Sequence, residues 1–92
     1  MGFEWDEHKN EANLEKHGIS FDEAQFAFND PKRVITVDGK HSTSSEKRYF
    51  CFGKLRGRVV TVRFTKRNEN IRIYGAGYWR EGNAKYKKKN KL

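Results

Sequence analysis

The sequence has little of several residue types on which common classes of protein depend. Cys51 is the only cysteine, which excludes a disulfide framework and a cysteine-rich zinc site. No apolar run approaches the ~18 residues that a membrane span needs, and no apolar signal segment follows Met1. Proline occurs once, which is not typical of a low-complexity chain. We therefore expect a cytoplasmic protein that does not contact a membrane.

Several motifs of catalysis and cofactor binding are also missing. The chain has no G-x-x-x-x-G-K-[ST] loop, no G-x-G-x-x-G after an expected strand and no G-x-S-x-G elbow. Its three histidines are not at zinc-ligand spacing with Cys or Glu partners, and its basic half has no paired carboxylates. The sequence therefore predicts no metal and no cofactor.

Charge is plentiful but unevenly distributed. The 92 residues carry a net charge of +8 and are enough for one domain, which we expect over residues 1–92. Residues 1–46 contain ten acidic and five basic residues, a formal charge of −5, whereas residues 47–92 contain two acidic and fifteen basic residues, a formal charge of +13. A half with this charge attracts polyanions, so RNA, DNA or an acidic protein are the expected partners.

The N-terminal half predicts two helices. Asp6 is a suitable N-cap for a helix over about residues 7–17. Ser20 and Glu23 have the spacing of a capping box, in which each side chain satisfies a backbone N–H at the start of a second helix. Pro31 stops that helix.

The remainder of the chain predicts strands joined by short turns, which favours an antiparallel meander. The expected strands cover residues 33–37, 47–53, 58–65 and 70–76. The expected fold class is α+β: two N-terminal helices packed on one face of a three- to four-stranded antiparallel sheet. A short C-terminal helix around residues 80–87 and a basic tail from about residue 85 to residue 92 would complete the chain.

The alternation of side chains along the strands assigns them to two faces. Phe50 and Phe52, with the apolar residues of the later strands, are expected to pack against the helices. The opposite face then carries Lys47, Tyr49, Cys51, Thr61, Arg63, Thr65, Arg72 and Tyr74. Because this face has no acidic residue, we expect it to bind anions, although a solvated outer face is the alternative interpretation.

RNA cleavage is one reaction that such a face could perform without a metal, because RNA supplies its own 2′-hydroxyl nucleophile. The reaction needs a proton acceptor, a proton donor and positive charge on the phosphorane. The candidate catalytic residues are three arginines for the phosphate, a supporting tyrosine and two alternatives for proton transfer: Arg63, Arg72, Arg80, Tyr74, Glu46 and His41. Because many basic proteins share this inventory, a non-catalytic binding module remains a second hypothesis.

Further residues are candidates for RNA binding, namely Lys47, Arg48, Tyr49, Trp79, Lys85 and Lys88. Two of them have a structural alternative. Arg48 could instead form an ion pair with Glu46, and Trp79 could pack the final segment rather than stack on a base.

Two groups of residues together resemble the signature of BrnT-type toxins over about residues 3–76. The first consists of Phe3-Glu4-Trp5-Asp6, Lys9, Asn10, Asn13, Lys16-His17-Gly18-Ile19-Ser20-Phe21, Glu23-Ala24, Phe28 and Asp30-Pro31. The second consists of Glu46-x-Arg48-Tyr49, Gly53, Val59-Val60-Thr61-Val62, Thr65-x-Arg67 and Ile71-Arg72-Ile73.

This resemblance implies a RelE-like fold and an RNA-cleaving toxin of a type II toxin–antitoxin pair, which inhibits translation. It also implies a small antitoxin with a ribbon-helix-helix domain, through which alone the toxin would reach operator DNA. One departure from the family pattern is Gly77, which stands where family members commonly have an arginine. Either Arg80 or Arg72 would then take over its role, or this chain binds RNA without cutting it.

Overall fold

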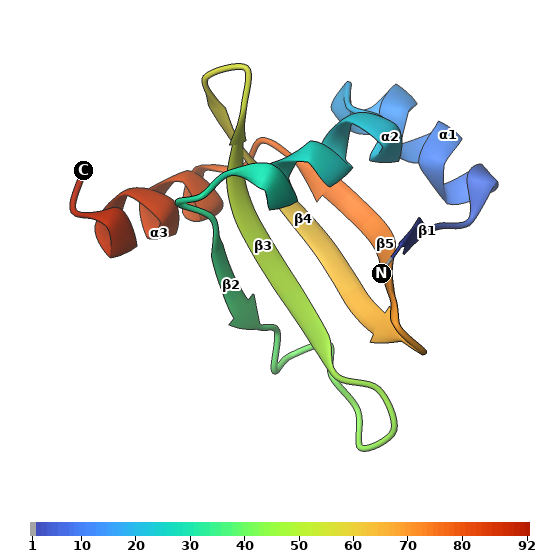
Figure 1. Cartoon of the computed structure of the whole chain (residues 1–92). Helices are drawn as coiled ribbons and strands as arrows, with labels where there is room; N and C mark the ends of the chain where they lie inside the picture. Colours follow the sequence, from blue (N-terminus) through green and yellow to red (C-terminus); the bar gives the residue numbers. More distant parts are fainter. Residues whose placement is uncertain (1) are drawn as a thin grey trace.

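The computed structural model describes residues 2–92 (Figure 1). In chain order its elements are β1 (Phe3–Glu4), α1 (Glu7–His17), α2 (Phe21–Ala24), the 3-10 helix η1 (Gln25–Asn29), β2 (Val34–Val37), β3 (Arg48–Leu55), β4 (Arg58–Arg67), β5 (Asn70–Gly77) and α3 (Arg80–Asn90). Among these residues no helix has both the length and the apolar character needed to cross a membrane.

The strands form one five-stranded mixed sheet in the order β1-β5-β4-β3-β2. Strand β1 runs parallel to β5, with Phe3 opposite Ile71, and the other neighbours are antiparallel. The expected antiparallel sheet of three to four strands is therefore wrong. Because β1 has only two residues and pairs with a strand at the other end of the chain, no local periodicity reveals it.

The first helix begins and ends as its sequence predicts. The Asp6 carboxylate accepts hydrogen bonds from the backbone N–H groups of His8 and Lys9, and Gly18 ends α1 with a φ of 72°. The capping box of Ser20 and Glu23 is also present.

The expected pair of N-terminal helices is nevertheless wrong. α2 makes only one turn before the chain tightens into η1, which ends at Asp30 with extended backbone. An extended conformation is favoured at Asp30 because Pro31 follows it. Within η1, the Ala27 carbonyl lies so close to Gly53 of β3 that a Cβ at residue 53 would collide with it. The short helical segment therefore lies directly on the sheet.

The helices cover both faces of the sheet. On the face of α1, α2 and η1, the core contains Ile19, Phe21, Cys51, Val60, Val62, Phe64 and Ile73. On the other face α3 buries a second cluster of Phe52, Val59 and Tyr86. The expectation that helices pack on one face only is corrected by this second cluster.

The register of β3 also corrects the expected division of the faces. Tyr49 lies opposite Phe64 and Cys51 opposite Val62, so both point toward the core of α1 and α2. Phe50 and Phe52 point toward α3. The sequence interpretation assumed that only one face of the sheet is buried. It therefore assigned Phe50 and Phe52, which pack toward α3, to the same face as the core of α1 and α2.

The C-terminal helix is attached by specific contacts to the sheet and to the segment that precedes β2. Tyr86 is 1% exposed, and its hydroxyl donates a 2.7 Å hydrogen bond to Asp30 Oδ2. The Asn90 amide donates to the carbonyl of Lys32. Gly82 is required where α3 approaches the sheet, because a Cβ there would collide with Thr61 and Phe52. Most of the segment expected as a basic tail is therefore helical, as far as Asn90.

Candidate functional site

Two guanidinium groups meet at one aromatic ring on the sheet face that α3 partly covers. The guanidinium carbon of Arg48 lies 4.3 Å from the ring centre of Tyr74, and that of Arg63 lies 5.1 Å from it. These residues come from β3, β4 and β5, the three central strands in the sheet order. We call them the Arg48–Tyr74–Arg63 cluster. Cations near the face of a tyrosine ring are attracted by its quadrupole, which holds the two arginines close together.

Tyr74 occupies the irregular point of the ladder between β4 and β5. The pairing passes from Arg63 opposite Gly75 to Phe64 opposite Ile73, which leaves Tyr74 as the extra residue of a β-bulge. Its hydroxyl is buried and has no hydrogen-bond partner among residues 2–92. A buried polar group without a partner costs stability, and a catalytic role is one reason why a protein keeps such a group.

Glu46 orients Arg48 and is poorly suited to act as a general base. Glu46 Oε1 accepts a 2.8 Å hydrogen bond from Arg48 Nε, and Oε2 lies 3.4 Å from Arg67 Nη2. The hydrogen bond from Arg48 lowers the pKa of Glu46, and the same contact raises the pKa of Arg48. A carboxylate with a lowered pKa is a weak proton acceptor, whereas a fixed guanidinium suits a phosphate.

His41 is held by a carboxylate that the sequence interpretation missed. His41 Nδ1 lies 2.7 Å from Asp38 Oδ2; the Asp38 side chain is 4% exposed and that of His41 is 43% exposed. A carboxylate on Nδ1 fixes the ring and leaves Nε2 facing outward. The Asp38-x-x-His41 spacing is visible in the sequence, but Asp38 was not among the predicted site residues.

The loop that carries His41 is bonded to the strand that carries Arg48. The backbone N–H of Asp38 donates to the Arg48 carbonyl at 2.7 Å, and the backbone N–H of Arg48 donates to Ser42 Oγ at 2.8 Å. The loop with the Asp38–His41 pair is therefore fixed to the end of β3 at which Arg48 lies.

Other candidates lie away from the cluster. Arg72 forms a 2.9 Å salt bridge with Glu4 of the parallel strand β1. Hydrogen bonds from Asn70 and then Arg72 lower the pKa of Glu4, so this pair stays ionised and Arg72 is already neutralised. Tyr49 lies on the opposite face, where its ring stacks on Phe64 with the ring centres 5.2 Å apart. Lys47 is exposed just before β3.

The remaining candidates belong to the chain around α3. Arg80 and Lys88 are exposed on this helix, and Lys85 forms a salt bridge with Glu81. Trp79, just before α3, lines a hollow of about 250 Å³ together with Arg63 and Tyr74. The structure therefore brings together Arg48, Arg63, Tyr74 and Glu46, and leaves Arg80, Lys85 and Lys88 on a separate element.

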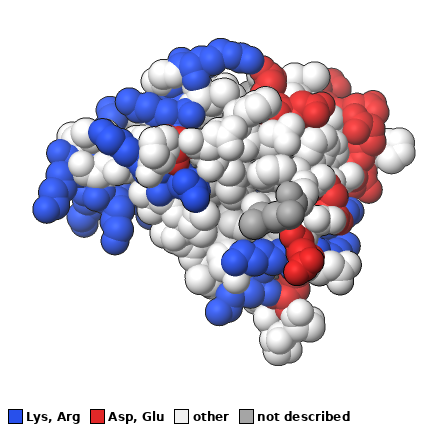
Figure 2. All heavy atoms as spheres, in the orientation of Figure 1, with Lys and Arg blue, Asp and Glu red and all other residues white. Residues whose placement is uncertain are grey.

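The charge separation seen along the sequence is also a separation in space. Figure 2 shows Lys and Arg gathered over α3 and the β3–β4 hairpin, and acidic residues gathered over α1 and α2. A molecule with one cationic side draws polyanions toward that side. Among residues 2–92 no three His, Cys, Asp or Glu side chains are grouped so that they could hold a metal ion.

Comparison with known proteins gives one result. A family model described as "Ribonuclease toxin, BrnT, of type II toxin-antitoxin system" matches residues 5–82. No curated protein matches the chain significantly.

Proposed function

The chain belongs to the BrnT family of ribonuclease toxins of type II toxin–antitoxin systems, and on this premise we propose that it cleaves RNA at the Arg48–Tyr74–Arg63 cluster. One observation carries the proposal: two arginine side chains lie over the ring of Tyr74, whose buried hydroxyl has no hydrogen-bond partner among residues 2–92. Such a site offers positive charge and one hydrogen-bond donor to a phosphate, the groups that a charged phosphorane requires.

In the proposed reaction the 2′-oxygen of one ribose attacks the adjacent phosphorus. His41 accepts the 2′-hydroxyl proton through Nε2, while Asp38 holds the ring from Nδ1. Arg48 and Arg63 stabilise the negative charge of the phosphorane, and the Tyr74 hydroxyl donates a hydrogen bond to it. The bond from phosphorus to the 5′-oxygen then breaks, and that oxygen takes a proton from solvent. The products are a 2′,3′-cyclic phosphate and a 5′-hydroxyl, and no step requires a metal.

This proposal assigns different roles to the arginines named from the sequence. Arg63 remains a phosphate ligand and is joined by Arg48, because both contact the Tyr74 ring. Arg72 is paired with Glu4 at the sheet edge and takes no part in the proposed reaction. Arg80, Lys85 and Lys88 lie on α3 and contribute to RNA binding rather than to the reaction.

The family description implies an antitoxin partner and an RNA target. We propose that the antitoxin is a small ribbon-helix-helix protein, that the toxin reaches operator DNA only through it, and that RNA cleavage in the cytoplasm inhibits translation. Finding a gene for such a protein beside this one, and co-purification of the two products, supports the pairing. An isolated gene contradicts it.

The Tyr74→Phe variant tests the catalytic assignment because it removes only the unpartnered hydroxyl. Replacing a buried polar group that has no partner is neutral or favourable for stability, so the variant should unfold at or above the wild-type temperature. We expect its rate of RNA cleavage to fall at least about tenfold, in line with the loss of one donor to a developing charge. Wild-type cleavage by a folded Tyr74→Phe protein would overturn the assignment.

A second function is favoured by one residue. Gly77 replaces the arginine of the family pattern, and its surroundings leave no room for a side chain, because a Cβ there would lie 2.6 Å from the Trp79 ring. A module that holds RNA or an antitoxin without cutting is consistent with this substitution. RNA that stays intact during prolonged incubation with folded protein would support this function over cleavage.

A further inference from the structure

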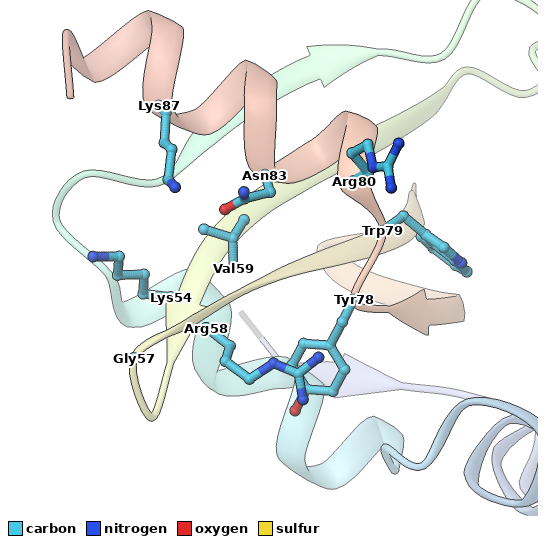
Figure 3. Close-up of a pocket in the computed structure, with 9 residues that line it drawn as sticks. All are labelled: Lys54, Gly57, Arg58, Val59, Tyr78, Trp79, Arg80, Asn83 and Lys87. Atoms are coloured by element: carbon cyan, nitrogen blue, oxygen red, sulfur yellow. The ribbon is translucent and has the colours of Figure 1, made fainter.

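A basic groove of about 530 Å³ lies between the β3–β4 hairpin and α3, beyond the Arg48–Tyr74–Arg63 cluster. Its charged and aromatic lining consists of Lys54, Arg58, Tyr78, Trp79, Arg80 and Lys87. Figure 3 shows Lys54 and Lys87 extending into the space between the hairpin and the helix, with Arg58 beside Tyr78. We call this the hairpin groove.

The cations of the hairpin groove are not neutralised by acidic side chains. Within residues 2–92, none of Lys54, Arg58, Arg80 and Lys87 forms a salt bridge, and no acidic residue lines the groove. On the face of the cluster, by contrast, the Glu46 carboxylate pairs with both Arg48 and Arg67 and offsets part of their charge. The groove therefore keeps four exposed positive charges and is the stronger attractor of a polyanion.

Aromatic rings distinguish this groove from a purely electrostatic site. The Arg58 guanidinium carbon lies 3.8 Å from the ring centre of Tyr78, and both Tyr78 and Trp79 are half-buried. Aromatic faces and stacked guanidinium planes bind unpaired nucleic-acid bases, while Lys and Arg bind the phosphates between them. An acidic peptide would use the charges but not the rings, so the lining favours a single-stranded nucleic acid.

The hairpin groove adjoins a hollow that contains two residues of the cluster. Trp79 lines the groove and also lines the hollow that contains Arg63 and Tyr74. An RNA strand that passes Trp79 on leaving the groove would enter the hollow beside Arg63 and Tyr74.

We propose that the hairpin groove is an anchoring site for single-stranded RNA, separate from the place of cleavage, which holds the nucleotides next to those presented to the Arg48–Tyr74–Arg63 cluster. The choice of RNA rests on the proposed function. Binding in the groove involves no bond change, so it can be measured apart from the reaction.

The test compares two double variants that remove the same charge. Arg58→Gln with Lys87→Gln removes two cations from the groove, and Lys32→Gln with Lys89→Gln removes two exposed cations outside it. The probe is a fluorescent single-stranded 2′-O-methyl RNA of about 12 nucleotides, within the length that such grooves bind. Its methylated 2′-oxygen cannot attack, so fluorescence anisotropy reports affinity alone.

We expect the groove variant to bind this RNA at least about tenfold more weakly than wild type at physiological salt. Because each phosphate contact contributes about 0.7 to the slope of log affinity against log salt, the slope should fall by about 1.4. The control variant should lose less than about twofold. Thermal unfolding of both variants near the wild-type temperature confirms that the comparison concerns binding.

Equal losses in the two variants would overturn the proposal, because they would show diffuse electrostatics instead of a groove. Displacement of the RNA by poly-L-glutamate as effectively as by unlabelled RNA would also overturn it, because the rings would then contribute nothing. Failure of the proposed function is separable: if wild type cuts no RNA but only the groove variant loses affinity, the anchoring site stands alone. If wild type cuts RNA and the groove variant binds normally, the anchoring site is wrong and the catalytic proposal stands.

Discussion

The indole of Trp79 lies directly against Gly77, so that a Cβ on residue 77 would stand 2.6 Å from the ring. The same indole meets His17 of α1 edge-on, with the ring centres 5.2 Å apart. Trp79 is therefore wedged between the end of β5 and α1. It occupies the space into which a side chain at residue 77 would extend.

Restoring the arginine of the family pattern at residue 77 should therefore destabilise this protein. We expect Gly77→Arg to lower the free energy of unfolding by about 1–3 kcal/mol, the usual cost of overpacking. Trp79→Ala in the same chain should relieve much of that cost, because the ring no longer opposes the new side chain. Urea unfolding of the two single variants and the double variant measures the coupling. If the effects of the two single variants add up to that of the double variant within about 0.5 kcal/mol, the contact between residue 77 and Trp79 is contradicted.

Gly53 should also not tolerate a side chain, in this case because of the Ala27 backbone. A methyl group at residue 53 collides with the backbone carbonyl of Ala27, and backbone cannot move aside as a flexible side chain can. We expect Gly53→Ala to cost about 3 kcal/mol, at the upper end of overpacking effects. Gly39→Ala is the matched control, because nothing lies within 4 Å of its added Cβ. Similar unfolding midpoints for the two variants would show that η1 does not press on β3.

The hydrogen bond from Tyr86 to Asp30 should make stability depend on pH at both ends of the scale. Burial first, and then Asp30, raise the pKa of Tyr86 to about 12. Burial tends to raise the pKa of Asp30, but the hydrogen bonds from Tyr86 and the Lys54 N–H outweigh it and the pKa is lowered. A raised Tyr pKa gives stability that is lost above about pH 10, and a lowered Asp pKa gives stability that is lost below about pH 4.

Tyr86→Phe tests that dependence. We expect it to lower the free energy of unfolding near neutral pH by about 1.5–3 kcal/mol, the value of a hydrogen bond to a charged group. The difference in free energy of unfolding between wild type and Tyr86→Phe should become smaller below about pH 4 and above about pH 10. Tyr74→Phe, which loses no hydrogen bond among the described residues, is the control and should show no such difference. A difference in free energy of unfolding that does not change with pH would contradict the proposed role of the Tyr86–Asp30 hydrogen bond.

His41 should be required for cleavage as a proton acceptor. We expect His41→Ala to lower the cleavage rate by about a hundredfold, within the range of general base catalysis. Imidazole added to the buffer should restore part of the rate, which a structural role for His41 would not allow. His8→Ala, on the exposed side of α1, is the matched control and should cut at the wild-type rate. Normal RNA cleavage by a His41→Ala protein would show that Asp38 and His41 take no part in the mechanism.

The sequence predicted those parts of the fold that local residues determine. Asp6 and Ser20 begin their helices where capping chemistry places them, since a cap acts within three residues. Pairing of Phe3 with Ile71 could not be predicted in this way, because it joins residues that only the folded chain brings together.

The faces of the sheet were harder to predict, because apolar residues point both ways along β3. Phe52 serves α3 and Cys51 serves the core of α1 and α2, so alternation alone does not show which face is solvated. The same error placed Tyr49 on the basic face. The cluster of Arg48 and Arg63 around Tyr74 depends on that register and on a bulge, and no local pattern in the sequence indicates either of them.

The chemistry of the RNA ends tests the central claim most directly. Purified wild-type protein is incubated with an RNA, and the ends at each cut are mapped in parallel with a folded Arg63→Ala protein. We expect 2′,3′-cyclic phosphate and 5′-hydroxyl ends from wild type, at least about a hundredfold fewer from Arg63→Ala, and no cut where the 2′-oxygen is methylated. Ends that carry a 5′-phosphate, cuts at methylated positions, or equal cutting by Arg63→Ala would contradict cleavage by the RNA's own hydroxyl at this cluster.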